Sequence, residues 1–159
     1  MPNEIPIVVI GKSMTADTRT CDFKNVSKET LLASSRQHIG DVQAAMRWVS
    51  DRIGEAAKVH DSDKISEIDW FHEDFVTGFE KTGWWDNHRA IWRHHLAQPD
   101  GVPQDVNLLD VLEYVVDCVM AGKARSGNVT PLLMSPELLH RAFENTVTML
   151  ASHVEVRDA

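Results

Sequence analysis

The sequence predicts an all-α protein, a single-domain helical bundle of five or six helices preceded by a short extended arm. Apolar residues recur at intervals of three and four along several segments, as on one face of a helix. Residues typical of helix starts and ends flank those segments. The 159 residues, 43% of them apolar, are also enough to bury a core. We expect the arm over residues 1–26 and a helical metal-binding domain over residues 27–155.

The first predicted elements are an extended run and a long helix. The β-branched run 5–10 ends at a glycine, which favours a short strand or an extended arm. Ser27 is a good N-cap for a helix reaching about Ala57, and its apolar stripe is expected to face inward. Gly54 is expected to weaken this helix, so that residues 60–61 lie at or near its end.

Two shorter helices are predicted in the middle of the chain. The first starts at Ser62 or Ser66 and is expected to end at Gly83, and it carries phenylalanines on one face. The second opens at Trp84 and extends through His95. A loop rich in proline and glycine follows it.

Two helices complete the predicted bundle. Asp105 or Asn107 caps the most apolar helix of the chain, which is expected to end at Gly122. Because that helix is apolar on most sides, we expect it to lie at the centre of the bundle. A polar loop follows, and then a serine and a proline at residues 135–136 start the final helix, before a polar tail.

Composition limits the classes of partner. The formal net charge of −8 argues against binding to a DNA or RNA duplex, which requires a basic face. Two cysteines are too few for a disulfide framework. No apolar run approaches the roughly 20 residues that span a membrane, and the N-terminus does not resemble a signal peptide. We expect a cytoplasmic protein, with homo-oligomerisation left open.

Histidines and aspartates beside the apolar segments form the candidate site. They are His38, His60, Asp61, His88, His94, His95 and Asp117. Asp117 interrupts an apolar run, so we expect it to be buried, and a buried carboxylate needs compensation by a cation or an ion pair. Glu113 and Asp110, one and two turns earlier, are candidates to orient ligand histidines. Imidazole nitrogen and carboxylate oxygen together suit manganese, iron, cobalt, nickel or zinc.

The order of these residues resembles the HD-domain superfamily of metal-dependent phosphohydrolases, which are all-helical. The stretch His-Asp-Ser-Asp-Lys at 60–64 is similar to the His-Asp-x-x-Lys form of its motif, found in the two-metal HD-GYP phosphodiesterases. The Gly-Tyr-Pro signature of that branch is absent. The chain also resembles a family of small phage and bacterial proteins, so a phage-encoded chain would act in the host cytoplasm. The resemblance covers roughly residues 35–150.

The resemblance implies one or two divalent transition-metal ions and a water activated by the metal that attacks phosphorus. Asp61 would bridge two ions, and helical spacing favours His95 over His94 as a ligand unless the helix kinks. The expected catalytic residues are Lys64, Asp61 and Glu67, with Lys64 stabilising charge on the phosphate. Candidate substrate-binding residues are Lys123, Arg125 and Arg89.

Three functions remain open at this point. The first is hydrolysis of a phosphate ester of a nucleotide or a related small molecule, by a nucleotidase or phosphodiesterase reaction. The second is a di-iron oxygenase on the same scaffold. The third is a non-catalytic protein that binds a nucleotide or another protein, with histidines that are structural. Metal content would separate the third from the first two.

Overall fold

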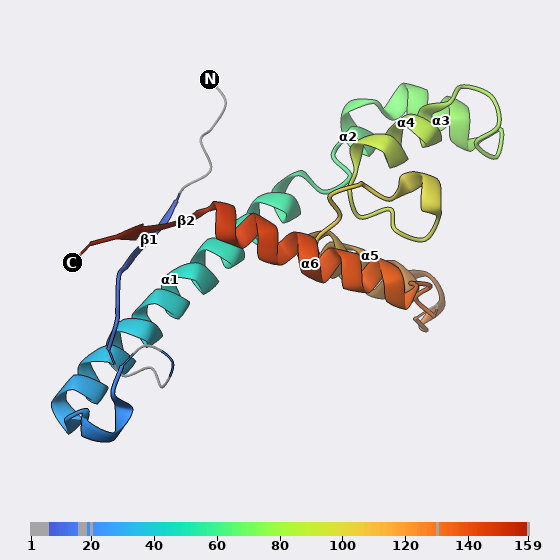
Figure 1. Cartoon of the computed structure of the whole chain (residues 1–159). Coiled ribbons are helices and arrows are strands. Elements are labelled where there is room, and N and C mark those ends of the chain that lie inside the picture. The colour runs from blue at the N-terminus through green and yellow to red at the C-terminus, as the bar shows by residue number, and fades with distance from the viewer. Residues whose placement is uncertain (1–6, 16–18, 20, 130, 159) are drawn as a thin grey trace. The chain divides into compact units, whose positions relative to one another are not determined.

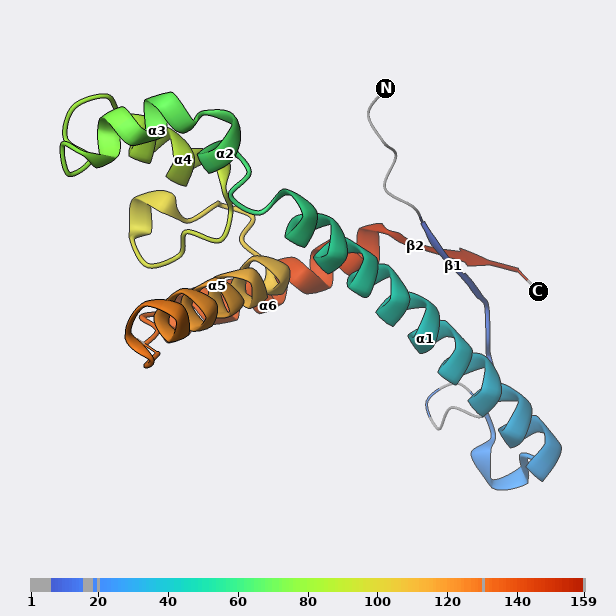
Figure 2. The same cartoon turned by 180° about the vertical axis from the view of Figure 1, so that it is seen from behind.

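The protein is described from a computed structural model, which describes residues 7–15, 19, 21–129 and 131–158. Residues 1–6, part of the predicted arm, and residue 130, at the end of a predicted loop, lie outside the described residues. The described chain is mainly helical, as predicted. Its elements, shown in Figures 1 and 2, are β1 (Val8–Gly11), η1 (Phe23–Asn25), α1 (Lys28–Val59), α2 (Asp63–Ser66), α3 (Ile68–Phe75), α4 (Trp84–Ile91), η2 (Pro99–Gly101), α5 (Leu108–Ser126), α6 (Pro136–Ser152) and β2 (Val154–Arg157).

The chain divides into two compact units. The first contains residues 1–51 and 148–159, and the second contains residues 52–147. This boundary lies inside α1, whereas the sequence suggested an arm ending at residue 26. The second unit holds most of the predicted site residues. Among the described helices, none combines the length and the apolar character that crossing a bilayer requires.

The first unit is built on a strand pair and the N-terminal part of α1. β1 and β2 pair in parallel, with Val8 opposite Val154. A short strand or an extended arm was predicted over residues 5–10, and a strand is found at residues 8–11, whereas β2 was expected to be a polar tail. The Gln37 side-chain amide donates to the Gly11 carbonyl at 2.7 Å, which ties α1 to the end of β1. The ring of the buried Trp48 lies 5.1 Å from that of His153.

The start of α1 was predicted correctly, but the orientation of its apolar stripe was not. Ser27 accepts a hydrogen bond from the Thr30 amide, so it caps the helix. The helix continues through Gly54 to Val59. Within the first unit, Ile39 and Met46 are 54% and 63% exposed. The side that carries Gln37 is the covered one, because the chain around β1 packs there.

In the second unit, the helix predicted after residue 62 is two short helices. α2 ends at Ser66, and Glu67 leaves the helical conformation before α3 begins. α3 ends at Phe75 because the backbone turns there, with Phe79 in the left-handed region at φ 66°. The buried Asp74 carboxylate accepts from the amides of Thr82 and Trp85, which fixes the start of α4. Burial alone would raise the pKa of Asp74, but these hydrogen bonds hold that pKa below its usual value.

α4 is shorter than predicted. It ends at Ile91, and Trp92 adopts an extended conformation with φ −91° and ψ 117°. His94 and His95 therefore lie beyond the helix, and the spacing argument that favoured His95 does not apply to them. Arg93 holds the following segment through two hydrogen bonds to the Asp110 carboxylate, at 2.8 and 2.9 Å.

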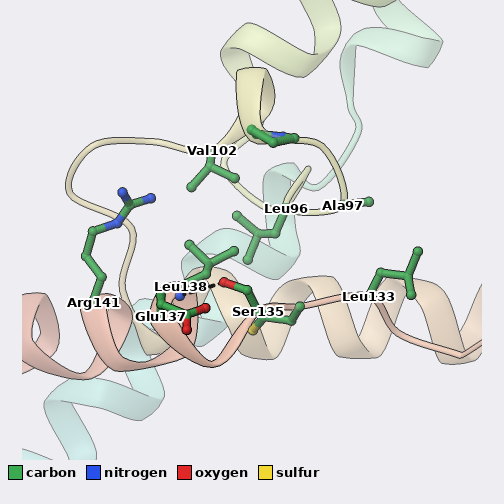
Figure 3. Close-up of a pocket in the computed structure, with 10 residues that line it drawn as sticks. Leu96, Ala97, Val102, Leu133, Ser135, Glu137, Leu138 and Arg141 are labelled. Carbon is green, nitrogen blue, oxygen red and sulfur yellow. Dashed lines mark hydrogen bonds between the residues drawn. The ribbon is translucent and has the colours of Figure 1, made fainter.

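α5 and α6 lie side by side in both views and form the core of the second unit (Figures 1 and 2). The buried residues of this core are Leu96, Val106, Tyr114 and Ala142. Asn107 caps α5 in a capping box with Asp110, as one of the two predicted caps. A cavity of about 730 Å³ lies beside the core, lined by residues of the 96–102 loop, the 133–135 segment and the start of α6 (Figure 3).

Two predictions about α5 were wrong. The helix continues through Gly122 to Ser126, so Lys123 and Arg125 lie on a helix and not in a loop. The helix is also not enclosed on most sides, since Leu112, Val116 and Met120 are 42%, 53% and 64% exposed. Only one side of α5 packs into the core of the second unit. An apolar face is therefore left open to solvent.

Candidate metal centre

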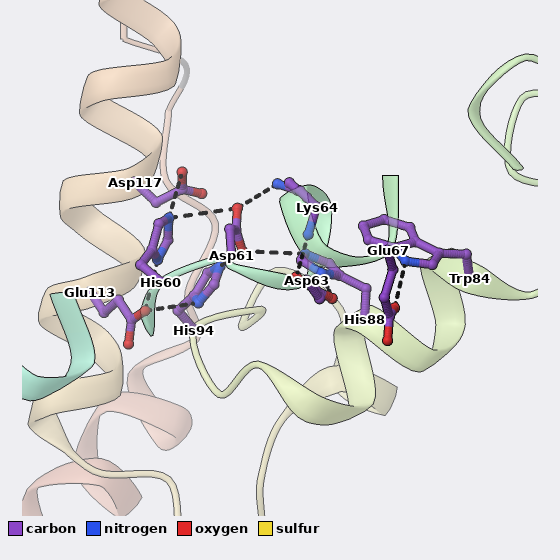
Figure 4. Close-up of polar contacts among 10 residues, drawn as sticks. All are labelled: His60, Asp61, Asp63, Lys64, Glu67, Trp84, His88, His94, Glu113 and Asp117. Atoms are coloured by element: carbon purple, nitrogen blue, oxygen red, sulfur yellow. Dashed lines mark hydrogen bonds and ion pairs between the residues drawn. The ribbon is translucent and has the colours of Figure 1, made fainter. Parts of the chain in front are cut away.

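Asp61 lies at the end of α1, where the chain turns sharply into α2. Its backbone is in the left-handed region, with φ 51°. This turn lets the neighbouring side chains of His60 and Asp61 approach each other, as the sequence suggested. His60 Nε2 and Asp61 Oδ2 are 3.6 Å apart. Asp61 thus lies at the middle of a cluster of side chains from the turn after α1, from α2, from α4 and the segment after it, and from α5 (Figure 4).

One side of Asp61 faces His60 and Asp117. His60 Nε2 lies 3.7 Å from Asp117 Oδ1 and 3.6 Å from Asp61 Oδ2. The three residues each offer a ligand atom within 4.8 Å of the others. Asp117 is 34% exposed, so the expectation that it would be buried was wrong, although it does join the predicted group.

The other side of Asp61 faces a set of buried histidines. Asp61 Oδ1 lies 3.4 Å from His88 Nε2 and 3.4 Å from His94 Nε2. The side chains of His88 and His94 are 0% and 1% exposed. His95 joins His94 and Asp61 in a further group of ligand atoms within 4.8 Å. The two oxygens of the Asp61 carboxylate therefore face different imidazoles, Oδ2 that of His60 and Oδ1 those of His88 and His94.

These separations have the size expected between ligands of one ion. Two ligand atoms that each lie about 2.1 Å from an ion and subtend a tetrahedral angle are about 3.4 Å apart. The distances of 3.4 to 3.7 Å around Asp61 match this value, and they are too long for direct hydrogen bonds. The arrangement has room for one ion on each side of the Asp61 carboxylate.

Carboxylates behind the imidazoles orient them. Glu113 Oε1 lies 2.8 Å from His60 Nδ1 and 3.1 Å from His94 Nδ1. Asp63 Oδ2 lies 2.7 Å from His88 Nδ1. A carboxylate on one ring nitrogen favours the tautomer that presents the other nitrogen to a metal. The hydrogen bonds at His60 and His88 accordingly present their Nε2 atoms toward Asp61, whereas His94 Nδ1 lies within ion-pair distance of Glu113 but makes no hydrogen bond to a described residue.

The centre contains buried polar atoms without hydrogen-bond partners. Among the described residues these include Asp61 Oδ1 and the Nε2 atoms of His88, His94 and His95. A buried polar atom without a partner costs free energy, of about 1–3 kcal/mol each. A divalent cation held by Asp61, His94 and His95 would satisfy one polar atom of each of the three residues. The donor set of imidazole nitrogen and carboxylate oxygen therefore fits a transition-metal ion.

The charge states of the cluster also suit metal binding. Burial lowers the pKa of His95 to about 3, and the neighbouring His94 and His88 contribute. Burial likewise lowers the pKa of His88, although the Asp63 carboxylate opposes this. Burial alone would raise the pKa of Asp61, but Lys64 keeps that pKa below its usual value. Neutral imidazoles and an ionised carboxylate are the forms that bind metal.

Lys64 contacts the Asp61 carboxylate directly. Its Nζ forms an ion pair with Asp61 Oδ2, and its side chain is 31% exposed. It is therefore placed beside the cluster, where the sequence argument expected a group that neutralises charge. The pair follows from the turn at Asp61, because α2 begins two residues later and returns Lys64 toward it.

Two predicted residues are not part of the cluster. Glu67 accepts a hydrogen bond from the buried Trp84 Nε1 at 3.0 Å, which is a structural contact, so its role as a general acid or base stays a prediction. His38 belongs to the first unit, where it is exposed and lines a cavity with Gln37 and Asp41. Its place among the ligands also stays a prediction.

The three predicted substrate-binding residues have other contacts. Arg89 is held by Asp86, Asp100 and Gln98, so it stabilises the loop after α4. Lys123 donates to the Gly127 carbonyl at the end of α5, and Arg125 is exposed on that helix. Their contact with a substrate stays a prediction.

Sequence reasoning missed Asp63 and misassigned Asp110. Asp63 is 8% exposed and holds His88, and its place two residues after Asp61 was the available signal. Asp110 was a candidate to orient a histidine, but it binds Arg93 and caps α5. Glu113, the other candidate, does contact two histidines.

We compared the chain with protein-family models, with curated proteins and with solved structures. None of them matches. The resemblance to the HD-domain superfamily therefore depends on the residues named above, and it remains a prediction.

Two cavities of the second unit reach the cluster. One, of about 330 Å³, lies between the end of α1 and α5 and is lined in part by His60, Glu113 and Asp117. The other, of about 260 Å³, is lined in part by Trp85, His95 and Asp117. Asp117 borders both cavities, which makes the cluster accessible to a small molecule from two sides.

Proposed function

We propose that this protein is a metal-dependent phosphohydrolase that acts on a phosphate ester of a nucleotide or a related small molecule. The observation that carries the proposal is the Asp61 carboxylate, whose Oδ2 faces the His60 imidazole and whose Oδ1 faces the imidazoles of His88 and His94. A shared carboxylate between two such groups is typical of centres that hold two divalent cations. His60, Asp61 and Asp117 would hold one ion, and Asp61, His94 and His95 the other.

The charge of the cluster supports an anionic substrate. The carboxylates of Asp61, Asp63, Glu113 and Asp117 and the ammonium of Lys64 together carry a net charge of −3. Two divalent cations would change that value to +1. A loaded centre would therefore attract a phosphate group, whereas the protein alone would repel it.

The residues of the cluster would have distinct roles in hydrolysis. Bound divalent ions act as Lewis acids and lower the pKa of the water that they bind. Glu113 and Asp63 would keep the imidazoles of His60 and His88 in one orientation, so that these ligands do not reorganise during the reaction. Lys64, held beside Asp61, is placed to stabilise negative charge that develops on the phosphate oxygens.

Metal content and hydrolysis test the proposal together. The full chain is purified without chelator, and its content of manganese, iron, cobalt, nickel and zinc is measured. It is then assayed against mononucleotides, nucleoside triphosphates, cyclic nucleotides and simple aryl and alkyl phosphates. We expect two ions per chain and hydrolysis of at least one class of ester.

Three results would contradict the proposal. The first is metal content well below one ion per chain at saturating metal, which would favour a protein with structural histidines. The second is fully loaded protein that hydrolyses no ester of the panel. The third is iron-loaded protein that consumes oxygen with a substrate and hydrolyses nothing, which would favour the di-iron oxygenase.

A further inference from the structure

The cavity of about 330 Å³ beside the candidate centre is mainly apolar. Its lining contains side chains from the end of α1 and from one face of α5, including Ile53, Ala56, Leu112, Val116 and Met120. Leu112, Val116 and Met120 are each more than 40% exposed. These residues recur every four positions, so they form one continuous strip along α5. We call this cavity the apolar groove.

The polar residues of the apolar groove all belong to the candidate metal centre. They are His60, Glu113 and Asp117. Two of them are candidate ligands of one ion, and the third holds the His60 imidazole. The groove is therefore continuous with the position where the phosphate of a substrate would lie.

We propose that the ester bound at this centre carries an aliphatic or aromatic group that lies in the apolar groove. This inference rests on the proposed function, because it places the phosphate at the metal centre. A loaded centre of net charge +1 attracts an anionic head, and the strip on α5 offers apolar surface to the group attached to it. The ligand is thus a small amphipathic phosphate.

The lining explains why a nucleobase is a poorer occupant of the groove. A site that recognises a base presents donors and acceptors to its edge. Among the described residues that line the groove, none is an asparagine, glutamine, serine, threonine, lysine or arginine. A base placed there would lose hydrogen bonds to water without replacement. An apolar group loses none.

Binding of alkylphosphonates tests the inference without turnover. The full-length protein, loaded with manganese, is titrated calorimetrically with methyl-, butyl- and hexylphosphonate. We expect affinity to rise about twofold to fourfold for each added methylene, as burial of apolar surface predicts. The metal-free protein is expected to bind hexylphosphonate at least tenfold more weakly, because the head then has no cation.

Neutral substitutions on α5 identify the surface responsible. The double variant Leu112→Gln, Met120→Gln keeps side-chain size and helix propensity, and both side chains are exposed, so the fold is retained. We expect this variant to bind methylphosphonate with the affinity of the original protein. It should lose most of the increase in affinity that accompanies a longer alkyl chain. Leu133→Gln is the matched control, since Leu133 is 71% exposed and lines the separate cavity of Figure 3.

The outcomes separate this inference from the proposed function. Equal affinity for methyl- and hexylphosphonate would overturn the inference and leave the proposed function intact. Tighter binding of adenosine monophosphate than of hexylphosphonate would do the same, because a base would then be the preferred group. If no phosphonate of any length binds loaded protein, both proposals fail. If affinity still increases with alkyl-chain length in the double variant, the inference would also be overturned.

Discussion

The second unit contains two regions that break the usual rule of burial in opposite ways. Around Asp61, the imidazoles of His88 and His94 are almost fully enclosed, at 0% and 1% exposure. Along α5, the apolar side chains of Val116 and Met120 are 53% and 64% exposed. Polar groups are normally at the surface and large apolar groups inside. Both departures occur on the borders of one cluster.

The comparison shows what each region needs from a ligand. A bound cation would satisfy the buried polar atoms that lack partners, and an apolar ligand would cover the exposed apolar side chains. A single complex would meet both needs, namely metal ions at Asp61 and an amphipathic phosphate that extends from them along α5. The predictions below test each half of this comparison, beginning with the largest expected effect.

Replacing the shared carboxylate should have the largest effect. Asp61→Asn removes the charge that faces both imidazole groups, yet asparagine tolerates the left-handed backbone at φ 51°. We expect both ions to be lost and hydrolysis to fall by a factor on the order of 10³. Metal analysis and initial rates check this.

Asp69→Asn is the control for that substitution, because Asp69 is an exposed aspartate in the first turn of α3. It should keep metal content and rate. An Asp61→Asn variant that still binds two ions per chain would show that the carboxylate is not shared.

Weakening the contact between Glu113 and the imidazoles beside it should have a smaller effect on metal binding. Glu113→Gln keeps a side chain of the same shape but weakens the hold on His60 and His94. We expect metal affinity to fall about 10- to 100-fold, as when groups behind metal ligands are removed. Competition with a fluorescent chelator measures it. An unchanged affinity would mean that the two histidines do not depend on Glu113 for their orientation.

Removing metal should lower stability by a few kcal/mol. At a free-metal concentration 100 times Kd, binding stabilises the folded state by about 2.7 kcal/mol. For a chain of this size, that corresponds to roughly 5–10 °C in Tm. Thermal unfolding with and without chelator checks this. The Asp61→Asn variant should show no such difference, and a shift of equal size in that variant would place the metal elsewhere.

Removing the N-cap of α5 should have the smallest effect, which is a loss of folding stability. Asn107 caps the helix that carries Glu113 and Asp117, and it accepts from the Leu109 amide at 2.9 Å. Asn107→Ala should cost about 1 kcal/mol, whereas Asn107→Ser should cost only a few tenths. Denaturant unfolding compares the two. If serine is as damaging as alanine, then capping is not what Asn107 contributes.

Helices were predictable where local signals decide them. Ser27, Asn107 and residues 135–136 are strong starting signals, and each starts a helix in the structure. The end of α4 at Ile91 was not predictable, because apolar spacing continues to His95 and the turn at Trp92 depends on tertiary contacts. Gly122 was misread as a helix end because glycine inside a helix costs only about 1 kcal/mol.

The candidate site was partly predictable for a similar reason. Residues 60–64 and Asp117 stand out by residue type beside apolar segments. The approach of both His88 and His94 to Asp61, and the contact of Asp63 with His88, require knowing where the chain turns. The exposure of Val116 was not predictable either, because it depends on tertiary packing. An apolar helix face in a sequence predicts that the face is covered, but it does not identify the segment or ligand that covers it.

The most direct test of the central claim is anomalous diffraction from crystals of the full chain grown with manganese. We expect two anomalous peaks on opposite sides of the Asp61 carboxylate, one beside His60 and Asp117 and the other beside His94 and His95. A structure at saturating manganese without a peak within coordination distance of Asp61 would contradict it.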